Sequence, residues 1–351
     1  MNSEDFFESL AQQLIKELPF VAYRKPNLNS LKALLQKNNK LYFTKNFEEN
    51  GFVFAPFEDK ANTVLIPSEN SDINICDFVI SNVGEKSQNG FDKFSSKEKQ
   101  NHINLVQKGI VAINSGKFKK VVLSRSECVS LADSNPITIF KHLLSTYPSA
   151  FVYCWYHPKV GLWLGATPET LLKIEDNRFY TMALAGTQTY KGILDVQWSK
   201  KEIEEQQIVV DYIVSSLQSL AEKMNISKTK TVKSGSLLHL RSDISGYIIE
   251  GENYLQLLIK ALHPTPAVCG LPRMQSKEFI LNNENYNREF YTGFLGEINT
   301  NTSEIFVNLR CMQLKNNDAI LYIGGGITKD SNPEDEWQET LNKAKIIKRV
   351  L

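Results

Sequence analysis

Two glutamates and a lysine near the C-terminus are spaced so that they can share one face of a helix. Glu336, Glu339 and Lys343 stand at positions i, i+3 and i+7, and the glycine run 324–326 precedes this predicted helix. Glycines leave room for a close approach to the backbone, which a surface helix does not need. The segment therefore predicts one wall of a site that binds a cation and an anionic ligand.

A second pair of glutamates stands near the start of a helix predicted over 199–224. Glu202 and Glu205 are three residues apart, and Val209 and Ile213 continue roughly the same face as an apolar stripe, so this face points toward protein. Either glutamate pair alone also fits a simpler interpretation, in which acidic side chains of a first turn complement the helix dipole. Two such pairs favour a shared site, because four carboxylates suit Mg²⁺ that bridges to an anionic substrate.

Lys120 and Glu169 are candidates for a general base and a general acid. Lys119 and Lys120 precede an apolar strand, and because side chains alternate along a strand, one of these lysines can face inward. An amine beside an apolar interior can act as a base, and a carboxyl group in a partly apolar cleft can act as an acid. The alternatives are two solvated lysines and a surface turn at Glu169. A base and an acid on different strands suit a reaction that adds and removes water across one ring.

Arg310 lies inside an apolar pattern that predicts a strand over 304–314. A buried arginine is uncommon unless it is paired, so we expect an ion pair with a glutamate or a bound carboxylate. The segment 262–273 holds three prolines and a glycine, which predicts a rigid, shaped loop. The glycine run 324–326 matches neither glycine-rich phosphate-binding motif, so a nucleotide site is disfavoured.

The composition excludes several classes of protein. The 351 residues carry 40 basic and 39 acidic side chains, and a net charge of +1 argues against nucleic-acid binding. Five dispersed cysteines without a CxxC pair disfavour a zinc site or a disulfide framework. The acidic, amphipathic N-terminus is unlike a signal peptide, and no apolar run reaches the roughly 18 residues of a membrane span. We therefore expect a cytoplasmic protein with neither a membrane nor a nucleic acid as partner.

Strand signals are grouped around a few helices, which predicts an α+β fold. A helix is expected from Pro333, with Ser331 or Asn332 as its cap, and further helices at 1–18, 97–116, 140–149, 199–224 and 252–262. Expected strands are 41–47, 51–57, 62–67, 118–131, 294–299, 304–314 and 319–325, and an antiparallel meander is expected from 150–158, 160–166 and 178–186. We expect residues 1–100 to form a variable region packed on a catalytic domain at 101–351.

A series of short motifs resembles those of the chorismate-utilising enzymes, and within them the isochorismate synthases. The motifs run in family order from about residue 100 to the C-terminus: KVVLSR from Lys120, GATPETLL, ALAGT, KEIEE, LHPTPAVCG, REFYTGFLG, IFVNLRC, IGGGIT and PEDEWQETLNK. The resemblance implies a large α+β domain in which two antiparallel sheets and surrounding helices enclose the site.

The resemblance also implies the ligands of that site. Mg²⁺ is expected on Glu205 and Glu336, with Glu202 and Glu339 as close or water-mediated partners, where it would clamp the ring carboxylate of chorismate. The residues expected to line the substrate are Gly186, Thr187, His239, Ala267, Tyr291, Arg310, Gly325 and Lys343.

By the same resemblance, Lys120 deprotonates a water that attacks ring carbon C2, and Glu169 protonates the departing C4 hydroxyl. The amine-transferring relatives lack a lysine matching Lys120 and carry a threonine where this chain has Ala267, so water is the expected nucleophile. Gln206 departs from the family, in which many members have histidine at this position.

Two other functions fit the same motifs. A salicylate synthase makes isochorismate and then eliminates pyruvate with the same constellation. A non-catalytic chorismate-binding protein would bind without turnover, although the presence of both Lys120 and Glu169 speaks against it. The resemblance implies a monomer whose partner is the small molecule chorismate, and a product used for menaquinone or for a catechol siderophore.

Overall fold

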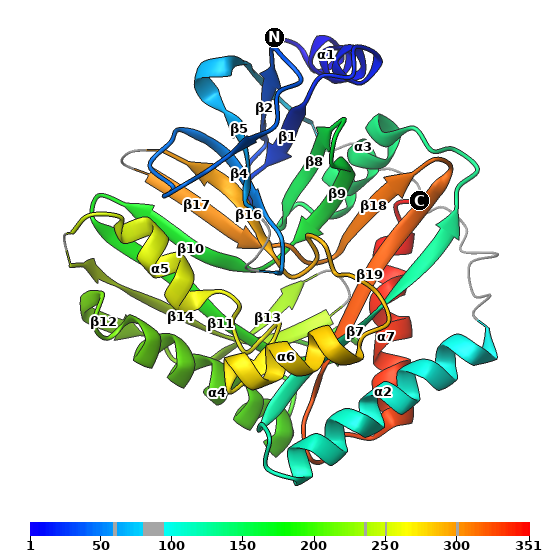
Figure 1. Cartoon of the computed structure of the whole chain (residues 1–351), viewed down its shortest axis with the longest axis vertical. Coiled ribbons are helices and arrows are strands. Elements are labelled where there is room, and N and C mark those ends of the chain that lie inside the picture. Colours follow the sequence, from blue (N-terminus) through cyan, green and yellow to red (C-terminus); the bar gives the residue numbers. More distant parts are fainter. Residues whose placement is uncertain (59–61, 80–94, 235–236, 250, 300–301) are drawn as a thin grey trace.

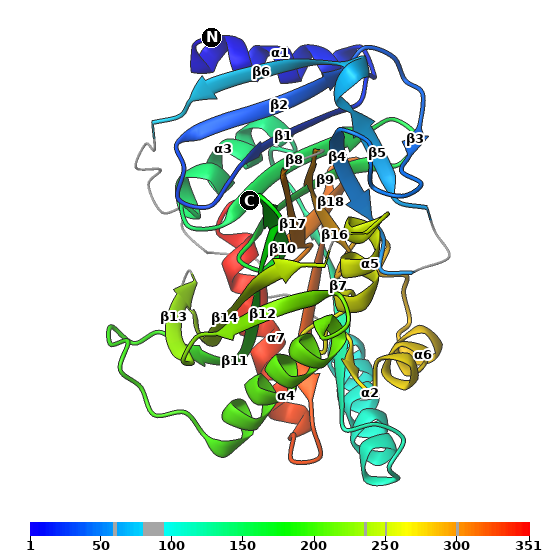
Figure 2. The same cartoon turned by 90° about the vertical axis from the view of Figure 1, so that its left-hand side faces the viewer.

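Two large antiparallel sheets, with helices on their outer faces, make up the computed structural model (Figure 1). It describes residues 1–58, 62–79, 95–234, 237–249, 251–299 and 302–351. The sheets pack face to face, and the view turned by 90° shows β6, β2 and β1 next to α1 (Figure 2). This architecture confirms the predicted α+β class with two antiparallel sheets. No helix in the described ranges is long and apolar enough to cross a membrane.

The first sheet, sheet A, has nine strands in the order β15-β7-β19-β18-β9-β8-β1-β2-β6 among the described residues. In that order the strands are Gly270–Leu271, Lys120–Ser130, Asp318–Ile327, Cys311–Lys315, Gly161–Thr167, Phe151–His157, Phe20–Arg24, Ser30–Gln36 and Ser71–Asp77.

The second sheet, sheet B, runs β12-β14-β11-β10-β17-β16-β4-β5-β3, with β13 paired to β14. In that order the strands are Ala221–Ile226, Leu237–Ile248, Arg178–Thr189, Thr170–Glu175, Thr302–Val307, Phe294–Ile298, Gly51–Ala55, Val64–Pro67 and Tyr42–Phe43, and β13 is Lys230–Ser234.

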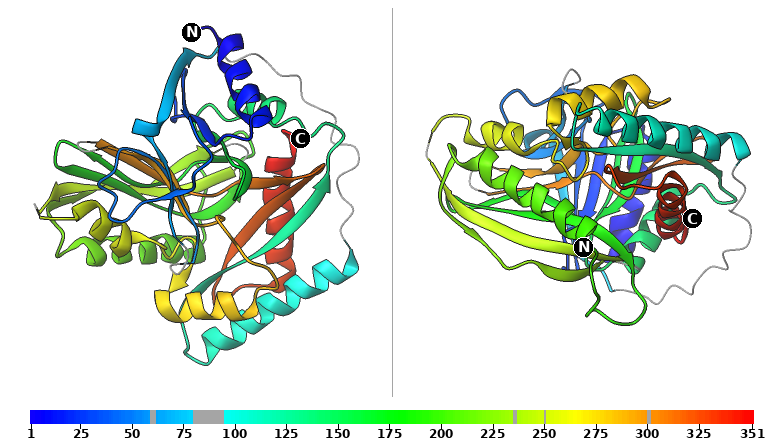
Figure 3. Two further views of the ribbon diagram at one scale, coloured as in Figure 1. Left: turned by 45° about the horizontal axis from the view of Figure 1, so that its top comes forward. Right: turned by 90° about the horizontal axis from the view of Figure 1, so that it is seen from below.

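The helices cover the outer faces of the sheets and leave the inner faces to each other. Helices α1 and α3 pack on sheet A, α4 and α5 pack on sheet B, and α2, α6 and α7 surround the β7–β19 end. Figure 3 shows α1 and α2 at opposite ends of the molecule. The helices are Ser3–Ile15, Ser96–Asn114, Pro136–Thr146, Lys200–Leu217, Tyr254–Leu262, Arg273–Asn283 and Pro333–Lys348, with a 3₁₀ turn at Ser68–Asn70.

Aromatic side chains form much of the core between the two sheets. Phe151 of β8 stacks on Phe306 of β17 with ring centroids 4.2 Å apart, and Phe54 of β4 lies 5.0 Å from Trp155 of β8. Such pairs bury large apolar areas and add roughly 0.5–1.5 kcal/mol beyond that burial. The sheets are therefore held firmly together beside the region where the site forms.

The first hundred residues extend both sheets. β1, β2 and β6 continue sheet A, while β3, β4 and β5 continue sheet B. Ion pairs join the extension of sheet A to strands β16 and β17 of sheet B: Lys32 contacts Glu297, and Nζ of Lys25 lies 3.0 Å from Oε2 of Glu304. The N-terminal region thus packs on residues 101–351 through strand pairing as well as side chains.

The predicted meander at 150–186 is wrong in one respect. β8 and β9 form a hairpin in sheet A, but β11 belongs to sheet B, where it pairs with β10. The chain leaves sheet A after Thr167 and enters sheet B at Thr170. Strand length and alternation are local signals, whereas the choice of sheet depends on partners far away in sequence.

The strand predicted over 304–314 is also wrong, because two strands in different sheets share it. β17 ends at Val307 in sheet B and β18 begins at Cys311 in sheet A. Arg310 lies in the break with φ of +48°. The two crossings between sheets lie side by side, since the N–H of Val307 donates to the carbonyl of Glu169 at 3.0 Å. This arrangement brings Glu169 and Arg310 to one place.

The helix predicted over 199–224 ends earlier than expected. α4 stops at Leu217, and residues 221–226 form β12, which pairs with β14. Edge pairing to an existing sheet overrides the helical pattern at this point. The C-terminal helix agrees with its prediction: Asn332 is the cap, its side chain accepts from the N–H of Glu334 at 2.9 Å, and Pro333 occupies the first turn.

Candidate active site

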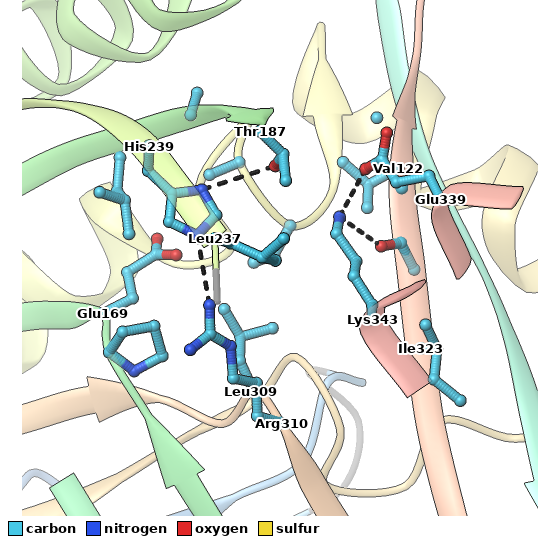
Figure 4. A pocket seen from close by; sticks show the side chains of 18 of the residues that line it. Val122, Glu169, Thr187, Leu237, His239, Leu309, Arg310, Ile323, Glu339 and Lys343 are labelled. Carbon is cyan, nitrogen blue, oxygen red and sulfur yellow. Dashed lines mark hydrogen bonds and ion pairs between the residues drawn. The ribbon is translucent and has the colours of Figure 1, made fainter. Parts of the chain in front are cut away.

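A single cavity gathers most of the predicted site residues, with walls from β7, β19, β11, β14, α4, α7 and both crossings between the sheets. Twelve of the predicted residues line it: Glu169, Gly186, Thr187, Glu202, Glu205, His239, Ala267, Tyr291, Arg310, Gly325, Glu339 and Lys343. The other two, Lys120 and Glu336, lie directly behind this wall, where each contacts a side chain that lines the cavity. Figure 4 shows Glu169, His239 and Arg310 on one side, and Lys343 with Glu339 on the other.

The glycines of β19 let charged side chains approach the backbone. A Cβ atom on Gly326 would lie 2.6 Å from Oε1 of Glu205 and 3.1 Å from Cε of Lys120. Nζ of Lys120 lies 2.7 Å from Oε1 of Glu205, close enough for an ion pair although without the alignment of a hydrogen bond. Lys120 is fully buried and Lys119 is exposed, which confirms that one of the two lysines faces inward.

The carboxylates of α7 stand against the next glycine. A Cβ atom on Gly325 would lie 3.4 Å from Oε2 of Glu336 and 3.6 Å from Oε1 of Glu339. Lys201 of α4 donates to Oε1 of Glu336 at 3.1 Å, and Lys343 lies 2.7 Å from Oε1 of Glu339. Each of these carboxylates therefore has a lysine partner, as Glu205 has.

The two α7 carboxylates differ in their proton affinity. Burial raises the pKa of Glu336, and the neighbouring charge of Glu339 adds to this effect, against the opposing charge of Lys201. Burial acts in the same direction on Glu339, but the ammonium of Lys343 outweighs it and the pKa of Glu339 is lowered. The site thus crowds negative charge at a place where added positive charge would be favourable.

The donor set suits a hard cation, although its present arrangement does not converge on one point. Within the described ranges, no three His, Cys, Asp or Glu side chains lie close enough together to hold a metal ion. Oε2 of Glu336 is buried without an aligned hydrogen-bond partner, although the Ser331 hydroxyl is near enough to lower its pKa. Mg²⁺ binds carboxylate oxygens, and a buried oxygen without a hydrogen-bond partner is suited to this role. Glu205 and Glu339 face the same glycine run from α4 and α7.

Glu202 has a structural role in addition to any role at the metal. It lines the cavity, but its Oε2 accepts hydrogen bonds from the N–H of Ser199, at 3.0 Å, and from the Ser199 hydroxyl. These contacts form a capping box at the start of α4. The simpler interpretation of the first-turn glutamates therefore accounts for part of what Glu202 does.

Glu169 lies at the crossing between β9 and β10, where the surrounding protein excludes water from its side chain. Its side chain is 4% exposed, and this burial raises its pKa to about 8, although the charge of Lys120 acts in the opposite direction. A carboxyl group that keeps its proton near neutral pH can donate it to a leaving group. Glu169 is therefore buried rather than part of a surface turn, and its role as an acid stays a prediction.

Arg310 presents a guanidinium group to the cavity with the help of His239. The Nη2 group of Arg310 donates to Nε2 of His239 at 3.2 Å, and Nδ1 of His239 donates to the carbonyl of Gly186 at 2.8 Å. Burial, with the charge of Arg310, lowers the pKa of His239 to about 3, so the ring is neutral. Burial also lowers the pKa of Arg310 to about 10, which still leaves it charged at neutral pH.

Lys343 supplies a second cation on the opposite wall. Its Nζ donates to the carbonyl of Gly324 at 2.9 Å as well as pairing with Glu339. Tyr291 stacks on Tyr322 at 5.5 Å between ring centroids, and a Cβ atom on Gly324 would lie 2.8 Å from the Tyr291 hydroxyl. Two cations on opposite walls, with aromatic and apolar surface between them, suit a small anion that carries more than one carboxylate.

Lys201 is the main site residue that the sequence reasoning missed. It lines the cavity and binds Glu336, and its position on α4 is four residues before Glu205. The same spacing rule that paired the glutamates places Lys201 on their face, so a usable signal was present. Tyr322, within the strand before the glycine run, was also missed.

Comparisons with known proteins agree with this fold and show its family. A family model described as "Chorismate binding enzyme" matches residues 73–351. Isochorismate synthase DhbC of Bacillus subtilis is 29% identical over 274 residues, which cover 72% of this chain and 68% of the relative. The salicylate biosynthesis isochorismate synthase of Pseudomonas aeruginosa is 30% identical over 270 residues, covering 73% of this chain and 56% of the relative.

The fold has a close structural relative. The structure of MenF, the menaquinone-specific isochorismate synthase of Escherichia coli, superposes with a TM-score of 0.77 at 22% identity, covering 95% of this chain and 88% of that one. The matched segments of the two sequence relatives thus span between about half and two thirds of their length, while the fold likeness extends over nearly the whole chain.

Proposed function

This chain belongs to the chorismate-binding enzyme family, and from that premise we propose that it is an isochorismate synthase, an isomerase that converts chorismate to isochorismate. The observation that carries the proposal is a fully buried lysine and a buried carboxyl group with a raised pKa at one cavity: Lys120 behind its wall and Glu169 in its lining. The names of the sequence relatives support the same reaction.

The proposed binding mode uses the two cations on opposite walls. Chorismate carries a ring carboxylate and a second carboxylate on its enolpyruvyl group, and Arg310 and Lys343 would each meet one of them. His239 accepts from Arg310 and so fixes one face of the guanidinium group. Thr187, Gly186 and Ala267 would complete the walls without adding charge.

Mg²⁺ would be held by Glu205 and Glu336, with Glu339 and Glu202 as close or water-mediated partners. The support for this assignment is the buried oxygen of Glu336 that lacks an aligned partner, together with the carboxylates that crowd the glycine run. When bound, the ion supplies positive charge to the ring carboxylate of the substrate.

We assign the two proton transfers to Lys120 and Glu169. Lys120 takes a proton from the water that adds at C2, and Glu169 gives its proton to the hydroxyl that leaves C4 as water, while the ring double bonds shift. The atoms balance because one water enters and one leaves. Lys120 must be unprotonated when the water binds, and exchange with solvent restores both groups.

Incubation of the purified protein with chorismate and Mg²⁺ tests this proposal directly. We expect isochorismate to accumulate until it reaches equilibrium with chorismate, with no pyruvate released, as followed by liquid chromatography and a pyruvate-coupled assay. Fluorescent salicylate together with pyruvate would instead establish the salicylate synthase. Chorismate binding by calorimetry without turnover would establish the non-catalytic alternative.

Replacement of Gly326 by alanine is expected to lower kcat/KM for chorismate by about 10²-fold, because small misplacements of catalytic groups cost this much. The new Cβ atom would lie 2.6 Å from Oε1 of Glu205 and 3.1 Å from Cε of Lys120, so one of them must move. Gly251→Ala is the matched control, since nothing lies within 4 Å of a Cβ atom there. Equal kinetics in the two variants would contradict the close packing assigned to Gly326.

We further propose that the protein acts as a cytoplasmic monomer. Every group used above comes from one chain, so the site needs no second copy. Its product would serve menaquinone or siderophore synthesis; the structural relative is named as menaquinone-specific, and the resemblance implies both uses.

A further inference from the structure

Lys201 places an ammonium group among the carboxylates that the metal would use. It is a first-turn residue of α4, and its Nζ donates to Oε1 of Glu336 on α7 at 3.1 Å. Glu336, Glu339 and Glu205 stand against the neighbouring glycines Gly325 and Gly326, and Lys201 lines the same cavity. These three carboxylates, which we call the acidic cluster, are three of the four assigned to the cation, and Lys201 contacts one of them directly.

In the acidic cluster, positively charged side chains of the protein itself lie against the carboxylates. Glu205 is paired with Lys120, Glu336 with Lys201, and no three metal-binding side chains converge within the described ranges. Crowded buried carboxylates repel one another unless positive charge lies between them. In the present arrangement lysines provide this charge, and the buried Oε2 of Glu336 remains without an aligned partner.

We propose that Lys201 is a built-in counter-cation, which neutralises the acidic cluster in the metal-free protein and must leave when Mg²⁺ binds. The inference rests on the metal assignment of the proposed function. It gives Lys201 a role distinct from substrate binding: the residue sets how tightly the site takes up the ion.

Lys201 is better suited to leave than Lys120. The Lys201 side chain is 35% exposed, whereas that of Lys120 is 0% exposed and enclosed beneath β19. A long, partly exposed lysine can turn its ammonium into solvent at small cost, since its stem remains on the surface. Lys120 has no such route and stays beside Glu205.

The test compares Lys201→Gln with Lys200→Gln in metal-stripped, full-length protein. Lys200 is the adjacent residue on α4, its side chain is 90% exposed, and it pairs only loosely with Glu204 at 3.6 Å, so it is a matched control. Titration with Mg²⁺ by isothermal calorimetry should show binding roughly tenfold tighter in Lys201→Gln, because a competing unit charge a few ångströms away is gone. Lys200→Gln should bind Mg²⁺ like the unmodified protein.

Thermal unfolding gives a second readout that does not depend on activity. Without metal, Lys201→Gln should unfold at a lower temperature than Lys200→Gln, because its carboxylates lose their internal cation. Saturating Mg²⁺ should remove that difference. Lys201→Arg, which keeps the charge, should restore metal-free unfolding to that of the unmodified protein, and this variant separates loss of charge from failure to fold.

Two results would overturn the inference in different ways. Equal or weaker Mg²⁺ binding by Lys201→Gln, with normal binding by the unmodified protein, would show that Lys201 does not compete and would leave the metal assignment intact. Absence of Mg²⁺ binding in the unmodified protein and both glutamine variants, with or without chorismate, would reject the metal assignment itself along with the inference.

Discussion

Lys120→Gln is expected to lower kcat for chorismate turnover by about 10³-fold or more, the scale of losing a positioned general base. Glutamine has nearly the length of lysine and can fill the buried position, but its amide cannot take a proton from water. Lys120 contacts Glu205 and lies behind the cavity wall, so its removal leaves Arg310 and Lys343 in place. Chorismate binding, measured by calorimetry in the presence of Mg²⁺, should change by less than about tenfold, since no substrate-binding cation is removed.

Lys119→Gln supplies the matched control for this experiment. Lys119 is the neighbouring residue in sequence, but it is exposed and is not among the residues that line the cavity. Its replacement should leave both kcat and binding unchanged. Turnover by Lys120→Gln at more than about a tenth of the unmodified rate would exclude Lys120 as the base, because general-base catalysis contributes more than that.

Local sequence patterns predicted the orientation of side chains where that orientation depends on a single helix or strand. The alternation at Lys119 and Lys120 indicated that one lysine faces inward, and the first-turn proline with its polar cap indicated where α7 begins. Both features are confirmed, because strand alternation and helix capping are decided within a few residues. The face shared by Glu336 and Glu339 follows from the same helix geometry.

Pairing between strands that are distant in sequence determines the structural features that local sequence patterns did not predict. Arg310 was expected within one continuous strand, but it lies where the chain leaves sheet B for sheet A, with φ of +48°. Nothing in its neighbourhood signals the break, because the apolar alternation continues on both sides. The break nevertheless determines the site, since it brings Arg310 beside Glu169 and within reach of His239.

Competition between partners explains the remaining differences. Glu202 was expected near the metal, and much of its hydrogen bonding goes instead to the start of its own helix. Lys201 was not expected in the site, yet it pairs with a carboxylate on another helix. Sequence spacing shows which side chains share a face, but the tertiary arrangement selects which of several charged neighbours each one contacts.

Glu169→Gln is expected to lower kcat by about 10²–10³-fold, because its amide cannot protonate the leaving hydroxyl. In the unmodified protein, burial raises the pKa of Glu169 to about 8, and the acid must be protonated to act. Turnover should therefore fall about tenfold per pH unit as the pH rises above this value, and Glu169→Gln should lack that decline. A pH series of kcat from pH 6 to pH 10 makes the comparison, with Glu175→Gln at the exposed end of β10 as control.

Glu169→Gln is expected to have a higher free energy of unfolding than the unmodified protein at high pH, although its activity is lower. The pKa of Glu169 is 4.5 in the unfolded chain and about 8 in the folded protein. Between these two pH values the folded state therefore keeps a proton that the unfolded state has released. The stability that this proton supports is complete below pH 4.5 and is lost as the pH rises to about 8. Glutamine carries no charge to bury, so at pH 8.5 Glu169→Gln should be more stable by a few kcal/mol, at roughly 1.4 kcal/mol per pH unit of difference. Urea unfolding at pH 4 and pH 8.5 measures this gain, which should vanish at the lower pH.

A variant that loses activity because its fold is damaged would instead be less stable at both pH values. Slower turnover together with greater stability at pH 8.5 therefore identifies Glu169 as a carboxyl group that is buried in its protonated form.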